Sequence, residues 1–182
     1  RVLLLEAEEH PGYHATGRSA AFWTESYGGP LVQPLTTASR GFFDEHGLLA
    51  PRGALTLARA EDAAGLTGFV DEFSALGVRV DPLDRAALTE RLPGLKNEWQ
   101  LGAWEPDCCD IDVAGLHQLW LAQARRLGAE LLCRAPLTAA RRGAYGWTLM
   151  LAGAREYAAR VLINAAVAWA DPVAEMAGVA SL

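Results

Sequence analysis

The chain of 182 residues has few residues of the kinds that form disulfide frameworks or metal clusters. It holds three cysteines, and the adjacent pair Cys108 and Cys109 leaves an odd count without metal-ligand spacing. We therefore expect reduced thiols. No secretory signal is visible, although the chain begins with Arg1 and not with methionine. A cytoplasmic location is the default expectation, and peripheral membrane association stays open.

Long apolar runs and basic patches are also missing. No run approaches the roughly 18 apolar residues that a membrane helix needs. The net charge is −6, and the densest basic stretches are two isolated arginine pairs at 125–126 and 141–142. Such a surface does not release counterions from phosphates, so we expect no nucleic-acid partner. With 51% apolar and 21% charged residues, the composition is that of a folded globular protein.

The apolar pattern predicts an α/β protein. The opening run, residues 1–6, is continuously apolar and ends in an acid, which is typical of a strand buried in a parallel sheet. Because a complete domain rarely starts inside a core strand, we expect truncation there. Further strands are predicted at 53–58, 101–104, 130–133, 147–151 and 159–163, and helices at 19–27, 30–46, 61–76, 84–92, 112–127 and 171–177.

This order of elements fits a nucleotide-binding α/β domain interrupted by a second, α+β unit. We expect the first domain to comprise residues 1–29 and 105–182, and the insertion to comprise residues 30–104.

Three stretches indicate where chemistry could occur. Glu6 follows the opening strand, where an acid can accept hydrogen bonds from ribose hydroxyls, although a merely solvated acid is a common alternative. Residues 12–21 include small residues and two glycines before a predicted helix, so backbone N–H groups can approach an anion there. That string nearly matches a phosphate-binding P-loop, but Arg18 replaces the lysine, which disfavours an NTPase. A plain capping loop stays open.

The third stretch, residues 161–171, runs from an apolar segment into small residues. Small side chains permit close approach to a flat cofactor or to another backbone. Taken alone, a simple turn between a strand and a helix explains it equally well.

Together these strings resemble the D-amino-acid-oxidase-like family of FAD enzymes, which includes glycine and sarcosine oxidases. Within it the resemblance to bacterial D-arginine dehydrogenase is strongest. The resembling stretches are residues 3–6, GYHATGRSAAFWTESYG at 12–28, LTTASRGFF at 35–43, LLAPR at 48–52, DIDVAGLHQ at 110–118, and residues 163–179. The resemblance implies an incomplete Rossmann-like FAD-binding domain with an inserted α+β substrate domain.

The resemblance also implies which residues bind the cofactor, FAD. The acid matching Glu6 binds the adenosine ribose, and the stretch from Ala15 to Phe22 lines the pyrophosphate and flavin. Leu137 contacts the adenine through its backbone. The complete set of implied cofactor-binding residues is Glu6, Ala7, Ala15, Thr16, Gly17, Arg18, Ser19, Ala20, Ala21, Phe22, Leu137, Ala166 and Trp169.

For the substrate, the resemblance implies a small amine or amino acid oxidised by hydride transfer to the flavin, without a catalytic side chain. The positions matching Phe22, Thr24, Tyr27 and Ala54 belong to the substrate pocket. D-arginine dehydrogenase has a histidine in place of Phe22 and an acid in place of Ala54. We therefore expect a D-amino acid or related amine with a neutral or apolar side chain. The electron acceptor, oxygen or a quinone, stays open.

Three departures from the family pattern bear on this expectation. The family's Gly-x-Gly-x-x-Gly turn would precede Arg1, and its C-terminal part, with the arginine that binds the substrate carboxylate, would follow the last residue. Val167 stands where the family has glycine. Two alternatives therefore stay open: a flavoenzyme that oxidises a 2-hydroxy acid, and an inactive truncated fragment that binds no FAD.

Overall fold

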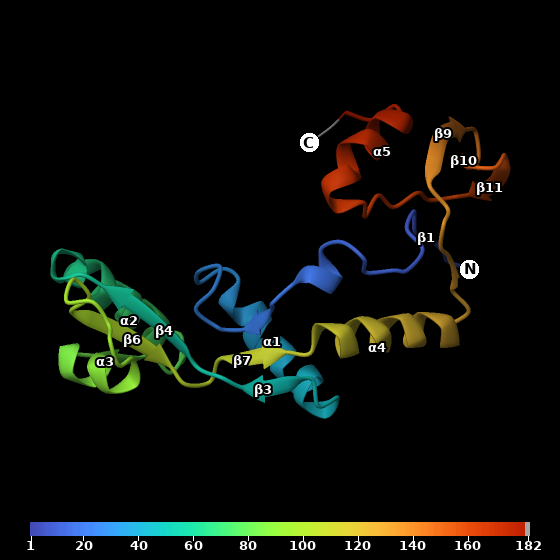
Figure 1. Ribbon diagram of the computed structural model, residues 1–182. Coiled ribbons are helices and arrows are strands. Elements are labelled where there is room, and N and C mark those ends of the chain that lie inside the picture. Colours follow the sequence, from blue (N-terminus) through green and yellow to red (C-terminus); the bar gives the residue numbers. More distant parts are fainter. Residues whose placement is uncertain (181–182) are drawn as a thin grey trace. The chain divides into compact units, whose positions relative to one another are not determined.

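The computed structural model describes residues 1–180 (Figure 1). Its contacts divide the chain into two compact units. The first comprises Arg1–Gly17 together with the chain from Gln118 onward, and the second comprises Arg18–His117. Among the described residues, no helix is both long and apolar enough to cross a bilayer.

A parallel strand pair begins the first unit. Strand β1 (Leu3–Leu5) pairs in parallel with β8 (Glu130–Leu132), with Leu3 opposite Glu130. This confirms the strands predicted at 1–6 and 130–133 and the parallel pairing expected from the apolar run. Parallel strands need a long connection between them, and here the rest of the chain up to residue 129 supplies it.

The same unit contains an antiparallel sheet of β9 (Leu137–Gly143), β10 (Gly146–Leu151) and β11 (Arg155–Ala159), in the order β11-β10-β9. Helix α5 (Ala170–Met176) packs against β9, and the three strands are drawn in orange at the C-terminal end of the colour scale in Figure 1. The strand predicted at 147–151 and the helix predicted at 171–177 are confirmed.

The strand predicted at 159–163 is wrong. Strand β10 turns back through a tight loop, so its partner is the polar segment Arg155–Ala159, and the ladder ends with Trp147 opposite Ala159. The apolar residues that follow lie in no strand, and Val161 and Ile163 are exposed. Strand β9 was not predicted either, because arginines interrupt its pattern.

The second unit has its core on a sheet of β4 (Ala54–Ala58), β6 (Leu101–Glu105) and β5 (Asp81–Leu83), in the antiparallel order β4-β6-β5. Helices α2 (Ala63–Ala75) and α3 (Arg85–Arg91) lie beside it in Figure 1. Apolar residues of α2 and of the segment that follows it pack against β6 in a cluster of Leu66, Phe69, Val70, Phe73, Val78, Val80 and Ala103. All four elements predicted in this part of the chain are confirmed.

A smaller sheet in the second unit joins β2 (Phe22–Trp23), β7 (Cys109–Ile111) and β3 (Leu49–Pro51), in the order β2-β7-β3. The short helix predicted at 19–27 is therefore wrong. The buried Trp23 donates its indole N–H to the carbonyl of Thr36 at 3.0 Å. Tertiary burial of this side chain, together with pairing to β7, overrides the local helical preference.

Two further helices match helices predicted from the sequence. Helix α1 (Gln33–Glu45) confirms the helix predicted at 30–46, although it begins three residues later. Helix α4 (Val113–Arg126) confirms the one predicted at 112–127, and the Asp112 carboxylate accepts the Gly115 N–H at 2.8 Å as its N-cap. Gly128 follows its end with a φ of +83°, as a helix stop requires.

Candidate functional site

Glu6 lies directly after β1 in the first unit. Its backbone N–H donates to the carbonyl of Leu132, and its own carbonyl accepts the N–H of Ala135, both at 2.9 Å. The carboxylate of Glu6 accepts the backbone N–H of Glu8 at 2.9 Å and is only partly buried. A carboxylate has lone pairs for several donors, so Glu6 can still accept hydrogen bonds from hydroxyl groups of a ligand. Ala7, beside it, is exposed.

The loop from Gly12 to Gly17 forms a tight turn that requires glycine. The Gly17 N–H donates to the Gly12 carbonyl at 2.7 Å, and a Cβ at Gly17 would meet that oxygen at 2.4 Å. Gly17 lies in the short 3₁₀ helix η1 (Thr16–Arg18), and Ala15 just before it is exposed. The turn therefore presents backbone with little side-chain cover, as close approach to a phosphate demands.

His14 connects this turn to the segment after β11. Its Nε2 lies 2.7 Å from a carboxylate oxygen of Glu8, and its ring centroid lies 4.6 Å from that of Trp169. Trp169 belongs to the 3₁₀ helix η3 (Val167–Trp169), where its N–H donates to the carbonyl of Ala166 at 2.9 Å. The structure thus brings together two sequence-predicted cofactor segments of the first unit, with His14 in a structural role.

Val167 has a backbone φ of +50°, in the left-handed region. That region is unfavourable for a β-branched residue and open to glycine. The structure therefore gives a backbone reason for the glycine that the resemblance places at this position. Its side chain is 73% exposed.

The implied cofactor residues divide between the two units. Leu137 lies in the first unit at the start of β9, opposite Leu151. With it in the first unit lie Glu6, Ala7, Ala15, Thr16, Gly17, Ala166 and Trp169, whereas Arg18, Ser19, Ala20, Ala21 and Phe22 belong to the second unit. In the second unit Ala21 is fixed through its carbonyl, which accepts the N–H of Ile111 at 2.9 Å.

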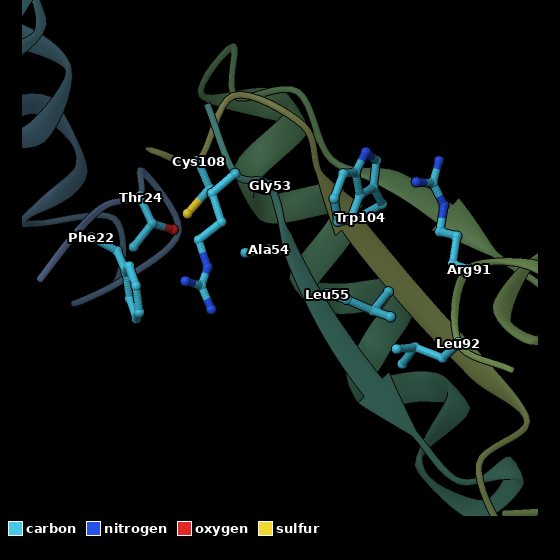
Figure 2. A pocket seen from close by; sticks show the side chains of 10 residues that line it. Phe22, Thr24, Gly53, Ala54, Leu55, Arg91, Leu92, Trp104 and Cys108 are labelled. Atoms are coloured by element: carbon cyan, nitrogen blue, oxygen red, sulfur yellow. The ribbon is translucent and has the colours of Figure 1, made fainter. Parts of the chain in front are cut away.

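A cavity of about 620 Å³ lies in the second unit (Figure 2). Three of the four predicted substrate residues, Phe22, Thr24 and Ala54, line it. Tyr27 does not line it and is 78% exposed. The other lining residues are Arg52, Gly53, Leu55, Arg91, Leu92, Trp104 and Cys108.

The cavity carries two guanidinium groups and no carboxylate among its lining residues. Arg52 stacks over the ring of Phe22, 4.4 Å from its centroid, and pairs with Asp110 at 2.9 Å. Arg91 lies over the ring of Trp104, also at 4.4 Å. Cation–π contacts of this kind keep the guanidiniums extended against the aromatic faces. The formal charges among the lining side chains are thus these two guanidiniums, and Asp110 pairs with one of them.

The sequence reasoning also gave no role at the cavity to Cys108, which lines it, or to Glu105. Cys108 is buried, and this burial, followed by the nearby charge of Glu105, raises the pKa of its thiol. A thiol with a raised pKa stays protonated near neutral pH and is a poor nucleophile. Glu105 is itself only 4% exposed. Its place at the end of an apolar strand, directly before Pro106, was the available signal.

The arrangement of strands and helices matches that of solved oxidases and of a solved dehydrogenase. Glycine oxidase from Geobacillus kaustophilus is 22% identical with a TM-score of 0.81, and the match covers 98% of this chain and 52% of that one. L-proline dehydrogenase from P. horikoshii is 17% identical with a TM-score of 0.83, covering 100% of this chain and 50% of that one. FAD-bound L-alpha-glycerophosphate oxidase from Mycoplasma pneumoniae is 13% identical with a TM-score of 0.83, covering 98% and 50%.

The fold is therefore that of these solved proteins, and this chain spans about half of their length. The model of the DAO family of FAD-dependent oxidoreductases matches residues 1–181. The chain belongs to this family, whose cofactor is FAD. The family resemblance, the α/β fold class and the cofactor predicted from the sequence are confirmed.

Proposed function

We propose that the whole protein oxidatively deaminates a D-amino acid or a related amine whose side chain is neutral or apolar. The observation that carries this proposal is the cavity, because it gathers Phe22, Thr24 and Ala54 around one space. Ala54 is distant in the sequence from Phe22 and Thr24, and each of the three was expected to face the substrate. When FAD is bound, its flavin would accept the hydride from the substrate.

Residues of the first unit fit the cofactor. Gly17 closes a turn that tolerates no Cβ, and the backbone around it is exposed. Glu6 keeps a partly exposed carboxylate at the end of β1, where a ribose hydroxyl can donate to it. Val167 is the one residue that fits less well, since its side chain occupies a backbone conformation suited to glycine.

The residues around the cavity support a neutral or apolar substrate side chain. Ala54 offers only a methyl group, and Phe22 offers an apolar ring. A cationic side chain would find no carboxylate in the lining and would approach the guanidiniums of Arg52 and Arg91. Like charges repel, so this arrangement disfavours arginine or lysine as substrate.

We assign residues 30–104 to a substrate domain and residues 1–29 with 105–182 to the FAD-binding domain. Residues of both proposed domains line the cavity. Phe22, Thr24 and Cys108 come from the second stretch, and residues 52–55, 91, 92 and 104 from the first. Three free thiols support the further proposal of a cytoplasmic location.

Steady-state kinetics of the full-length protein with bound FAD test the proposed substrate class. We expect kcat/KM for D-leucine and D-phenylalanine to exceed that for D-arginine. Ala54→Glu supplies a counter-charge and is expected to raise the D-arginine to D-leucine ratio about tenfold, which corresponds to about 1.4 kcal/mol. Ala54→Gln is the matched uncharged control.

Two outcomes of this substrate comparison would contradict the proposal. A wild-type protein that prefers D-arginine would overturn the side-chain preference. A protein that oxidises D-lactate faster than every amino acid would favour the 2-hydroxy-acid alternative.

A further inference from the structure

Glu105, the last residue of β6, is the one buried carboxylate among residues 1–180. Burying a carboxylate costs free energy unless donors satisfy it. The groups that donate hydrogen bonds to Glu105 therefore indicate what its carboxylate holds in place.

All the donors come from one short turn. Thr24 donates its hydroxyl to Oε2 of Glu105 at 2.9 Å, and Ser26 donates to the same oxygen at 2.5 Å. The backbone N–H of Glu25 donates to Oε1 at 2.7 Å. Glu105 thus fixes three consecutive residues that lie about 80 positions away in the sequence and directly follow β2.

The turn carries one residue of the cavity. Thr24 lines the cavity, and Figure 2 shows its side chain close to Cys108 and Phe22. A hydroxyl has a single hydrogen and two acceptor lone pairs. Since Thr24 donates its hydrogen to Glu105, its oxygen can only accept hydrogen bonds from other groups, and the neighbouring Cys108 thiol is one such group.

We propose that Glu105 is a positioning residue that presents the Thr24 hydroxyl to the cavity as a hydrogen-bond acceptor for an N–H or O–H donor of the substrate. This inference rests on the proposed function of the same cavity. Glu105 does not itself line the cavity, and both of its oxygens accept hydrogen bonds from the turn. Its effect on the substrate therefore passes through Thr24.

Steady-state kinetics of the full-length protein with bound FAD test this role, with D-leucine as substrate. Glu105→Gln keeps the shape of the side chain but places an amide N–H₂ against the donors of the turn. We expect KM to rise about tenfold with kcat within about twofold, because a contact made equally in the ground and transition states acts on KM. Glu98→Gln, an exposed carboxylate paired with Arg59 at 3.5 Å, is the matched control and should leave KM unchanged.

A double-mutant cycle shows whether Glu105 acts through Thr24. Thr24→Val removes the hydroxyl and should raise KM by a similar factor. In the Thr24→Val background, Glu105→Gln is then expected to add less than about twofold, since residues that act as one unit are not additive. Ser26→Ala removes one donor from the same turn without changing the cavity lining. It should raise KM a few-fold, which provides the test if Glu105→Gln does not fold.

Several results would overturn the inference. An active Glu105→Gln protein with unchanged KM and only a lower yield or FAD content would make Glu105 merely structural. If the fold-changes in KM caused by Glu105→Gln and by Thr24→Val multiply in the double variant, Glu105 does not act through Thr24. A wild-type protein that oxidises no amine contradicts the proposed function instead. An active wild type whose KM is unmoved by these variants overturns only the role of Glu105.

Discussion

At the residue scale, the backbone conformation of Val167 bears on a departure of this sequence from the family pattern. The resemblance places a glycine there, and the structure gives Val167 a φ of +50°. An L-residue in the left-handed region costs about 1–2 kcal/mol relative to its preferred conformations. The substitution from the family pattern therefore stores strain in the turn beside two implied cofactor residues, Ala166 and Trp169.

Val167→Gly is expected to stabilise the protein by about 1 kcal/mol, because relief of the strain outweighs the added freedom of the unfolded chain. Urea unfolding followed by tryptophan fluorescence measures this change. Ala168→Gly is the control: Ala168 does not have a positive φ, so that variant should lose about 0.5–1 kcal/mol. Equal destabilisation by both variants would show that Val167 is not strained.

Substrate residues were expected only at positions that match a family position facing the substrate. Phe22, Thr24 and Ala54 were expected beside the substrate, and the structure places all three around one cavity. Glu105 and Arg52 were not foreseen, because their importance arises from partners distant in the sequence. Nothing local to Glu105 indicates that the turn after β2 folds onto it.

At the element scale, the long periodic helices were predictable, whereas several strands were not. The helices α2, α3 and α4 follow from apolar spacing and from their capping residues. Strands β2, β3, β5 and β7 have two or three residues each, too few for a period to show. They form because a partner strand supplies hydrogen bonds, and that partner is set by the tertiary fold.

The entry into β4 depends on a glycine at position 53. Gly53 has a φ of +77°, and a Cβ there would lie 2.0 Å from the ring of Trp104. Its N–H donates to the carbonyl of Cys108 at 2.8 Å, so the backbone cannot shift without losing that hydrogen bond. This close approach brings β4, Trp104 and Cys108 together at the cavity.

Gly53→Ala is expected to destabilise the second unit by about 2–4 kcal/mol, the sum of a left-handed alanine and of displacement of a packed ring. Gly77→Ala separates the two costs, since Gly77 has a similar φ of +82° but nothing within 4 Å of an added Cβ. It should cost only about 1 kcal/mol. Urea denaturation midpoints compare the two variants, and equal losses would refute the contact with Trp104.

At the scale of the whole molecule, the family and the cofactor were predictable because the resembling strings extend along most of the chain. The family model matches residues 1–181, and the chain spans about half the length of the solved structures described above. The contact-based units and the domains proposed for FAD and substrate have different boundaries. Those domain assignments and the roles of the individual site residues stay predictions, because they depend on where the ligands bind.

The central claim is that Glu6 and the Gly12–Gly17 turn belong to an FAD site. The visible absorbance spectrum of the full-length protein, recorded after addition of FAD and removal of the excess, tests it most directly. We predict retained flavin bands near ~370 and ~450 nm, which Glu6→Ala abolishes or strongly reduces. Glu9→Ala, which changes an exposed acid of the same loop paired with Arg134, should keep them. A colourless wild-type protein, or a Glu6→Ala variant with full flavin content, would contradict the claim.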